Sequence, residues 1–158
     1  MTATLKVLCA TLALSLPVTI ASAESHVDPA IQGAITARQS HMRLYAHNLG
    51  ALGAMARGMV EYDAERASAA ASNLLALSQL SQGSYWVPGS DNSSVEGTRA
   101  LPAIWANIPD VVEHAAALTA AAESLAASAG TDLASLQAGM GAVGGACGAC
   151  HRAYRQSE

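Results

Sequence analysis

The sequence predicts an all-α protein, a left-handed antiparallel bundle of four helices that run up, down, up and down. The composition favours helix, because alanine dominates, β-branched residues are sparse and none of the 158 residues is a phenylalanine. Four segments place their apolar residues three and four positions apart, which is the spacing of one face of a helix. Faces that repeat near every 3.5 residues pack into left-handed bundles.

The first two helices are predicted to precede one long loop. The first begins at Asp28-Pro29, where a capping side chain precedes a proline at the first helical position. Its inward residues are Ile31, Ile35, Arg38, Met42, Tyr45, Leu49, Leu52 and Met59. The second runs from about Asp63 to Gln82, and its inward residues are Leu74, Leu77 and Leu80. Residues 83–99 follow, and their glycine, serine and proline predict a long loop.

The last two helices are predicted on either side of Gly130. The third begins near Leu101-Pro102, is kinked in its first turns by Pro109 and ends at Gly130. Its inward residues are Ile104, Ile108, Val111, Ala115, Leu118, Ala122 and Leu125. The fourth begins after Thr131, which we expect to be its N-cap. Its inward residues are Leu133, Leu136, Met140, Val143, Cys147, Cys150 and Tyr154.

The first 23 residues are typical of a secretory signal peptide. One positive charge, Lys6, precedes an apolar run over residues 7–20, and small residues follow that run. The run is shorter than the roughly 20 apolar residues that a membrane span needs. We therefore expect cleavage before Glu24, export to the periplasm, a single domain over residues 24–158 and no membrane span after processing.

Processing would leave two cysteines, Cys147 and Cys150, because Cys9 lies inside the apolar run. A disulfide between cysteines so close in sequence would stabilise a domain of this size very little. The processed chain carries seven arginines, no lysine and twelve carboxylates. It therefore has no basic stripe of the kind that binds nucleic acid.

The two cysteines belong to the segment CGACH, residues 147–151. Cysteines at positions i and i+3 of a helix point the same way, so each can form a thioether with one of the two vinyl groups of a porphyrin. His151 follows at once and can bring its imidazole to the iron. The spacing is that of c-type haem attachment and predicts one covalently bound haem c.

Other uses of the motif fit the sequence less well. A thioredoxin-like redox pair would need a strand before the motif, and a zinc site would need four ligands. A structural disulfide on a helix stays open as an alternative. Glycines also crowd this helix, at a cost of up to about 1 kcal/mol each relative to alanine. We interpret them as room for a macrocycle and a neighbouring helix, with a loosely held tail as the alternative; they lie at positions 139, 141, 144, 145 and 148.

The chain resembles the class II c-type cytochromes, the cytochrome c' family, over nearly all of the expected domain. The resemblance rests on three segments in the family's order: ITARQSHM in the first helix, LPAIW at the start of the third and CGACHRAYR in the fourth. It implies one haem between the helices, with Cys147 and Cys150 as attachment sites and His151 as the proximal iron ligand. The family also includes homodimers through the first two helices, and for this chain monomer and homodimer both stay open.

The resemblance makes Met42 the candidate distal ligand. Low-spin, electron-transferring members of the family have methionine at this position, and high-spin, gas-binding members have an apolar residue such as leucine. By its position alone, a methionine on an inward face can equally be core packing. Arg38, one turn earlier, matches an arginine that the family places near a haem propionate, and a side chain that snorkels to water is the alternative. Arg155, one turn after His151, is expected near the proximal side.

The other histidines are not expected at the iron. His41 and His47 lie off the predicted inward face, so both are expected to be exposed or half-exposed. His26 and His114 are expected to lie in solvent. A peroxidase would need a distal histidine, and only His41 could serve, although its helical phase is wrong.

These residues together predict a periplasmic electron carrier that acts through a haem ligated by His151 and Met42. With both axial positions filled, no position is open for a substrate, and the chain offers no general base beside an open iron. We therefore expect no enzymatic activity and expect redox proteins of the periplasm as partners. The alternative is a high-spin protein that binds nitric oxide or carbon monoxide, with Met42 not ligating.

Overall fold

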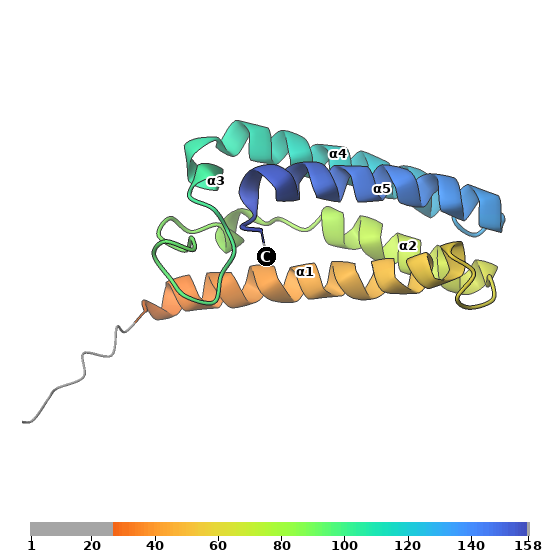
Figure 1. Ribbon diagram of the computed structural model, residues 1–158, viewed down its shortest axis with the longest axis horizontal. Coiled ribbons are helices and arrows are strands. Elements are labelled where there is room, and N and C mark those ends of the chain that lie inside the picture. The colour runs from red at the N-terminus through yellow and green to blue at the C-terminus, as the bar shows by residue number, and fades with distance from the viewer. Residues whose placement is uncertain (1–26, 158) are drawn as a thin grey trace, which may run out of the picture.

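A computed structural model describes residues 27–157, so the signal peptide, the cleavage site and His26 lie outside the described residues. Four long helices make up most of the described chain: α1 (Pro29–Ala56), α2 (Ala64–Ser78), α4 (Ile108–Ser128) and α5 (Leu133–Tyr154). The connection from α2 to α4 contains a 3-10 turn, η1 (Gly83–Tyr85), and a short helix, α3 (Ala103–Ala106). Figure 1 shows the four long helices side by side with alternating directions. This arrangement confirms the predicted all-α antiparallel four-helix bundle.

Three of the long helices begin at an aspartate whose side chain accepts a hydrogen bond from a backbone N–H of the first turn. These N-caps are Asp28, Asp63 and Asp132. Each satisfies an amide that has no partner inside its helix. The prediction that Thr131 is the N-cap of the last helix is wrong by one residue. The N-cap is Asp132, whose carboxylate accepts a hydrogen bond from the Ser135 amide at 2.7 Å.

The predicted third helix is two helices. α3 ends at Ala106, Asn107 leaves the helical conformation with φ −145° and ψ 57°, and α4 begins at Ile108. Pro109 explains the break, since proline has no N–H to donate to the carbonyl four residues earlier and its ring clashes with that carbonyl, so it fits only in the first turn of a new helix. The predicted kink is therefore a complete interruption.

The inward face of α1 differs in part from the predicted one. Its buried residues are Ala34, Ile35, Arg38, His41, Tyr45, Asn48, Leu52, Gly53 and Met55. His41 and Asn48 belong to this face because both hydrogen-bond α2: Nε2 of His41 lies 3.0 Å from the Leu77 carbonyl oxygen, and the Asn73 side chain donates to Asn48 at 3.0 Å. An apolar pattern alone does not reveal these polar positions.

Two residues predicted to face inward lie beyond the ends of their helices. α1 ends at Ala56 and α2 at Ser78, so Met59 and Leu80 are both exposed. Alanines provide most of the buried face of α2 instead, with Leu74 as its one large buried side chain.

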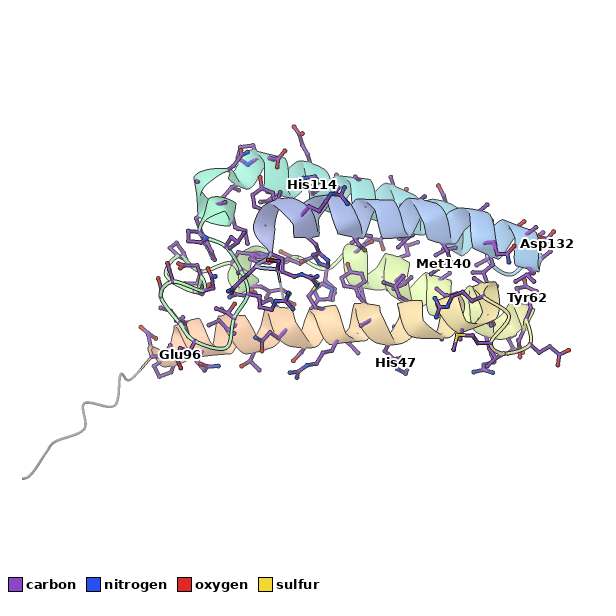
Figure 2. All side chains as sticks on the ribbon, in the orientation of Figure 1. His47, Tyr62, Glu96, His114, Asp132 and Met140 are labelled. Carbon is purple, nitrogen blue, oxygen red and sulfur yellow. The ribbon has the colours of Figure 1, made fainter. Side chains whose placement is uncertain are left out.

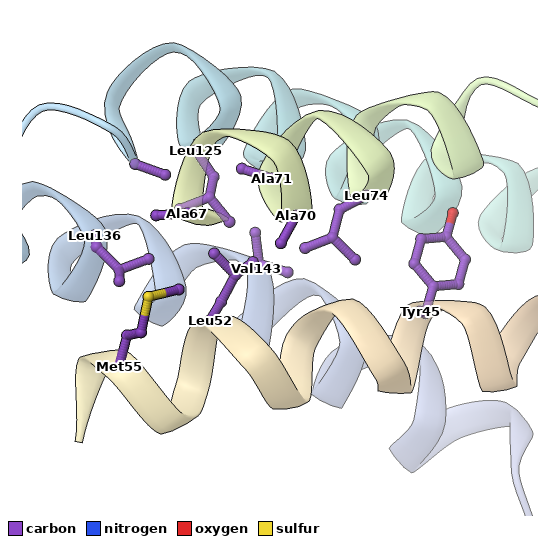
Figure 3. Packing of buried hydrophobic residues seen from close by; sticks show 11 residues of the cluster. Tyr45, Leu52, Met55, Ala67, Ala70, Ala71, Leu74, Leu125, Leu136 and Val143 are labelled. Carbon is purple, nitrogen blue, oxygen red and sulfur yellow. The ribbon is translucent and has the colours of Figure 1, made fainter. Parts of the chain in front are cut away.

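The fully packed core occupies the half of the bundle that lies away from the Cys-x-x-Cys-His motif. Figure 3 shows it, with leucines from all four long helices meeting over the alanines of α2. Its largest fully buried members are Leu52, Leu74, Leu125, Leu136 and Val143. Cys147 only packs against its edge. The core therefore joins the four helices, and none of the three motif residues lies at its centre.

The glycines of α5 do not all serve the packing of helices. A Cβ atom at Gly139 would lie 2.6 Å from Cδ1 of Leu125, so α4 and α5 approach closely there and the predicted close contact is confirmed. At Gly141, Gly144 and Gly145 a Cβ would meet nothing within 4 Å apart from the neighbouring backbone of its own helix. Their role beside a macrocycle stays a prediction.

Within residues 27–157, no helix is long and apolar enough to cross a membrane.

Candidate haem-binding site

α5 continues unbroken through the motif to Tyr154, as predicted. Cys147, Cys150 and His151 therefore occupy positions i, i+3 and i+4 of one helix, which lie on the same side of it. All three side chains are half-buried. A single rigid element thus presents two thiols and one imidazole to the same space.

Both cysteines are free thiols. Burial raises the pKa of each, and Cys147 and Asp110 raise that of Cys150 further. Reactive redox cysteines have lowered pKa values, so these thiols do not resemble a thioredoxin-like pair. Among the described side chains, no group of three or more His, Cys, Asp or Glu residues is placed to hold a metal ion.

The environment of His151 favours its neutral form. Burial lowers its pKa, and the positive charges of Arg155 and Arg99 lower it further. Neutral imidazole is the form that binds iron. Arg155 thus lies within electrostatic range of His151, while its contact with a haem stays a prediction.

Arg99 is a neighbour of His151 that the sequence did not indicate. The C-terminal end of the chain pairs with the segment before α3: the Leu101 amide donates to the Tyr154 carbonyl at 3.0 Å, and the Gln156 amide donates to the Arg99 carbonyl at 2.8 Å. Arg99 in turn donates from Nε to the Gln156 carbonyl at 3.0 Å. Short irregular segments carry no periodic pattern, so this pairing could not be read from the sequence.

Arg38 is buried and holds the long loop onto α1. Its guanidinium donates to Ser90 Oγ at 2.6 Å, to Thr98 Oγ1 at 2.7 Å and to the Tyr85 carbonyl at 3.2 Å, and it also donates to the Ser90 carbonyl. Its carbon Cζ lies 5.3 Å from the centre of the Trp86 ring. Burial lowers the pKa of Arg38, and the nearby Asp91 partly offsets this effect. The side chain therefore does not snorkel to water but has a structural role, and its place near a haem propionate stays a prediction.

Two substitutions distinguish the structural role of Arg38 from its predicted role at a haem propionate. We expect Arg38→Gln to lower the reduction potential, because a positive charge near a haem favours the ferrous state. Arg38→Lys should keep the potential near the wild-type value yet lose the forked hydrogen bonds to the loop, since an ammonium cannot replace a guanidinium in that geometry. Hydrogen bonds to charged groups contribute about 1.5–3 kcal/mol each, so both variants should unfold at lower denaturant concentration. Potentiometry and denaturant unfolding measure the two effects, and an unchanged potential in Arg38→Gln would leave only the structural role.

Met42 lies on α1 one turn after Arg38, but its side chain is 38% exposed. Its neighbours on the helix, Arg38, His41 and Tyr45, are buried. Met55 of the same helix is 2% exposed and belongs to the packed core. Met42 is thus not a core methionine, because it does not belong to the packed cluster of buried residues.

The expectation that His41 is exposed is wrong. The side chain is 4% exposed, because its ring binds the Leu77 carbonyl near the end of α2, where carbonyl groups lack helical partners. Burial lowers its pKa, and the bond to Leu77 offsets part of the effect. His47 is exposed as predicted, on the outer side of α1 in Figure 2. His114 is half-buried and lies 3.5 Å from the Asp110 carboxylate, so its predicted placement in solvent is also wrong.

Two buried polar atoms of the described side chains have no hydrogen-bond partner: His41 Nδ1 and Tyr45 Oη. The two rings stack, with centres 4.8 Å apart. Burial raises the pKa of Tyr45 to about 12, and Cys147 contributes to the rise, so this tyrosine lies close to an attachment cysteine. An unpaired buried hydroxyl costs about 1–3 kcal/mol. The unpaired Tyr45 hydroxyl beside Cys147 is therefore consistent with a group that binds at this cysteine and brings a hydrogen-bond partner for the hydroxyl.

A four-helix bundle with Cys-x-x-Cys-His near the end of its last helix defines a c-type haem protein. The family Cytochrome C' matches residues 33–155, which is most of the chain. A cytochrome c-554 of Cereibacter sphaeroides is 44% identical over 128 residues, covering 81% of this chain and 84% of the relative. A cytochrome c' of the same organism is 35% identical over 151 residues, covering 95% of this chain and 97% of the relative.

Solved structures agree with these sequence relatives. A cytochrome c' from Rhodobacter sphaeroides superposes with a TM-score of 0.79 at 34% identity, covering 81% of this chain and 98% of that one. The chain therefore belongs to the cytochrome c' family. Members of this family are haem proteins without enzymatic activity and bind one covalent haem c, which confirms the predicted cofactor.

Proposed function

We propose that this protein carries electrons in the periplasm through a haem whose iron is bound by His151 and Met42. The observation that carries the proposal is that Met42 lies on α1, is partly exposed and takes no part in the packed core, unlike Met55. Methionine binds haem iron in electron-transferring c-type cytochromes. The similarity to a cytochrome c-554 supports the same conclusion.

Each proposed site residue has a separate task. Cys147 and Cys150 would hold the macrocycle through two thioethers from one side of α5, and the pairing of residues 154–156 with residues 99–101 fixes this helix end. His151 offers a neutral imidazole because burial and two arginines lower its pKa. When bound, the haem supplies a one-electron couple between ferric and ferrous iron. Met42 would supply a thioether to the iron, and a sulfur ligand favours the ferrous state more than a second nitrogen ligand would.

An optical spectrum of the purified protein tests this proposal. Six-coordinate low-spin iron and five-coordinate high-spin iron absorb differently in both oxidation states. We expect a low-spin spectrum in the ferric and the ferrous protein. A high-spin ferric spectrum would contradict ligation by Met42.

The second candidate function is binding of nitric oxide or carbon monoxide at an open or easily opened iron. The partial exposure of Met42, at 38%, favours it, because a thioether at the edge of the bundle can move away without disturbing the core. In that case the reduced protein binds carbon monoxide readily. Titration of the ferrous protein with carbon monoxide distinguishes the two functions.

We also propose that the mature chain begins at Glu24 and contains a single domain. Cleavage after the small residues 21–23 would remove the apolar run and leave four residues before the N-cap Asp28. We expect N-terminal sequencing of the periplasmic fraction to begin Glu-Ser-His. A chain that keeps residues 1–23 and sediments with membranes would indicate an anchor instead.

A further inference from the structure

Three side chains outside the proposed ligand set tie the haem-binding end of α5 to the start of α4. Tyr154, the last residue of α5, donates a hydrogen bond from its hydroxyl to Asp110. The same carboxylate oxygen lies 3.5 Å from Nε2 of His114, one turn further along α4. The rings of His114 and Tyr154 meet edge to face, with centres 6.0 Å apart. Figure 2 shows His114 on α4 alongside the C-terminal turns of α5.

This cluster lies on the side of α5 that carries the motif. Tyr154 follows His151 by three residues and Cys150 by four, and residues at these separations are neighbours on a helix surface. The Asp110 carboxylate that Tyr154 binds is therefore held on the side of α5 that carries Cys150 and His151.

Both the backbone and the side chain of Tyr154 are hydrogen-bonded. The backbone carbonyl accepts a hydrogen bond from the Leu101 amide at 3.0 Å, and the buried side chain ends at Asp110. The last turn of α5, which includes His151, is thereby attached to the segment before α3 and to the first turn of α4. A movement of Asp110 or of Tyr154 would shift the helix end that carries the imidazole.

We propose that Asp110 is a positioning residue for the haem, which fixes the end of α5 through Tyr154 and lowers the reduction potential of the iron by its charge. The inference rests on the proposed attachment at Cys150 and ligation by His151, and it does not depend on Met42. Ferric haem carries one more positive charge than ferrous haem, so a nearby carboxylate stabilises the oxidised form. The hydrogen bond from the Tyr154 hydroxyl weakens the electrostatic effect of that carboxylate on the iron. The two groups therefore act on the potential with opposite signs.

Potentiometric titration of the haem-loaded protein tests this inference, at one pH and one ionic strength. Asp110→Asn removes the charge but keeps an oxygen that can accept the tyrosine hydrogen bond, and we expect it to raise the potential. Tyr154→Phe keeps the ring but leaves the carboxylate without its donor, and we expect it to lower the potential. In the double variant the effect of Tyr154→Phe should be much smaller than in the wild-type background, because the two residues act as a pair.

Glu113→Gln is the matched control, since it removes an exposed carboxylate from the same end of α4. The inference is overturned if Asp110→Asn shifts the potential no more than Glu113→Gln, or if both single variants at the cluster shift it in the same direction. Should Tyr154→Phe fail to retain haem, the sign and size of the Asp110→Asn shift against the control decide alone. A high-spin wild-type spectrum would refute the proposed electron carrier, yet the comparison of potentials would still test Asp110.

Discussion

Replacing both Cys147 and Cys150 by alanine is expected to abolish covalent haem binding completely. Each cysteine is proposed to supply one thioether, and the domain expected over residues 24–158 has no other cysteine that could replace them. Acid-acetone should extract no haem from the wild type, whereas any haem that the double variant takes up should be extracted entirely. Extraction of the wild-type colour under the same conditions would refute the attachment.

The single variants are the matched controls for this experiment. Cys147→Ala and Cys150→Ala each keep one thioether, so each should retain some haem against extraction. We also expect the double variant to keep most of its helix content, as measured by circular dichroism. The reason is that the packed core includes Leu52, Leu125 and Leu136, whereas Cys147 only packs against its edge. Complete unfolding would instead indicate that the haem is needed for the fold.

The four-helix bundle was predictable because its signals are local and repeated. Apolar residues recur three and four positions apart over each long helix, and aspartates, whose side chains can cap a helix, stand at three helix starts. The motif on α5 was predictable for the same reason, since three residues within five positions need only a helix to bring them together. Pro109 showed where the third helix is disturbed, and the structure adds that the helix is interrupted at Asn107.

What the sequence could not reveal depends on contacts between distant segments. His41 looked exposed by its phase on α1, but it is buried because the end of α2 offers it the Leu77 carbonyl. Arg38 looked like a side chain for a propionate, and its partners Ser90 and Thr98 lie more than fifty residues away in a loop without periodicity. The pair Asp110 and Tyr154 is hidden in the same way, since nothing in either segment indicates the other.

Met42→Leu is expected to change the iron from six-coordinate low-spin to five-coordinate high-spin. Leucine has nearly the same volume as methionine but no sulfur, so it can fill the space without binding iron. Substitutions that conserve volume usually cost less than about 1.5 kcal/mol, and Met42 is not in the packed core, so the bundle should remain folded. The ferrous variant should then bind carbon monoxide that the wild type binds poorly.

Met55→Leu provides the control, because it makes the same chemical change on the same helix at a methionine that is 2% exposed. Its spectrum should match that of the wild type, although its stability can fall, because the core is tightly packed around it. A spectral change confined to Met42→Leu assigns the sixth ligand to this sulfur, since any general loosening of α1 would affect the two variants alike. If the wild type is already high-spin, or if the Met42→Leu spectrum equals it, the thioether does not bind the iron and gas binding becomes the better-supported function.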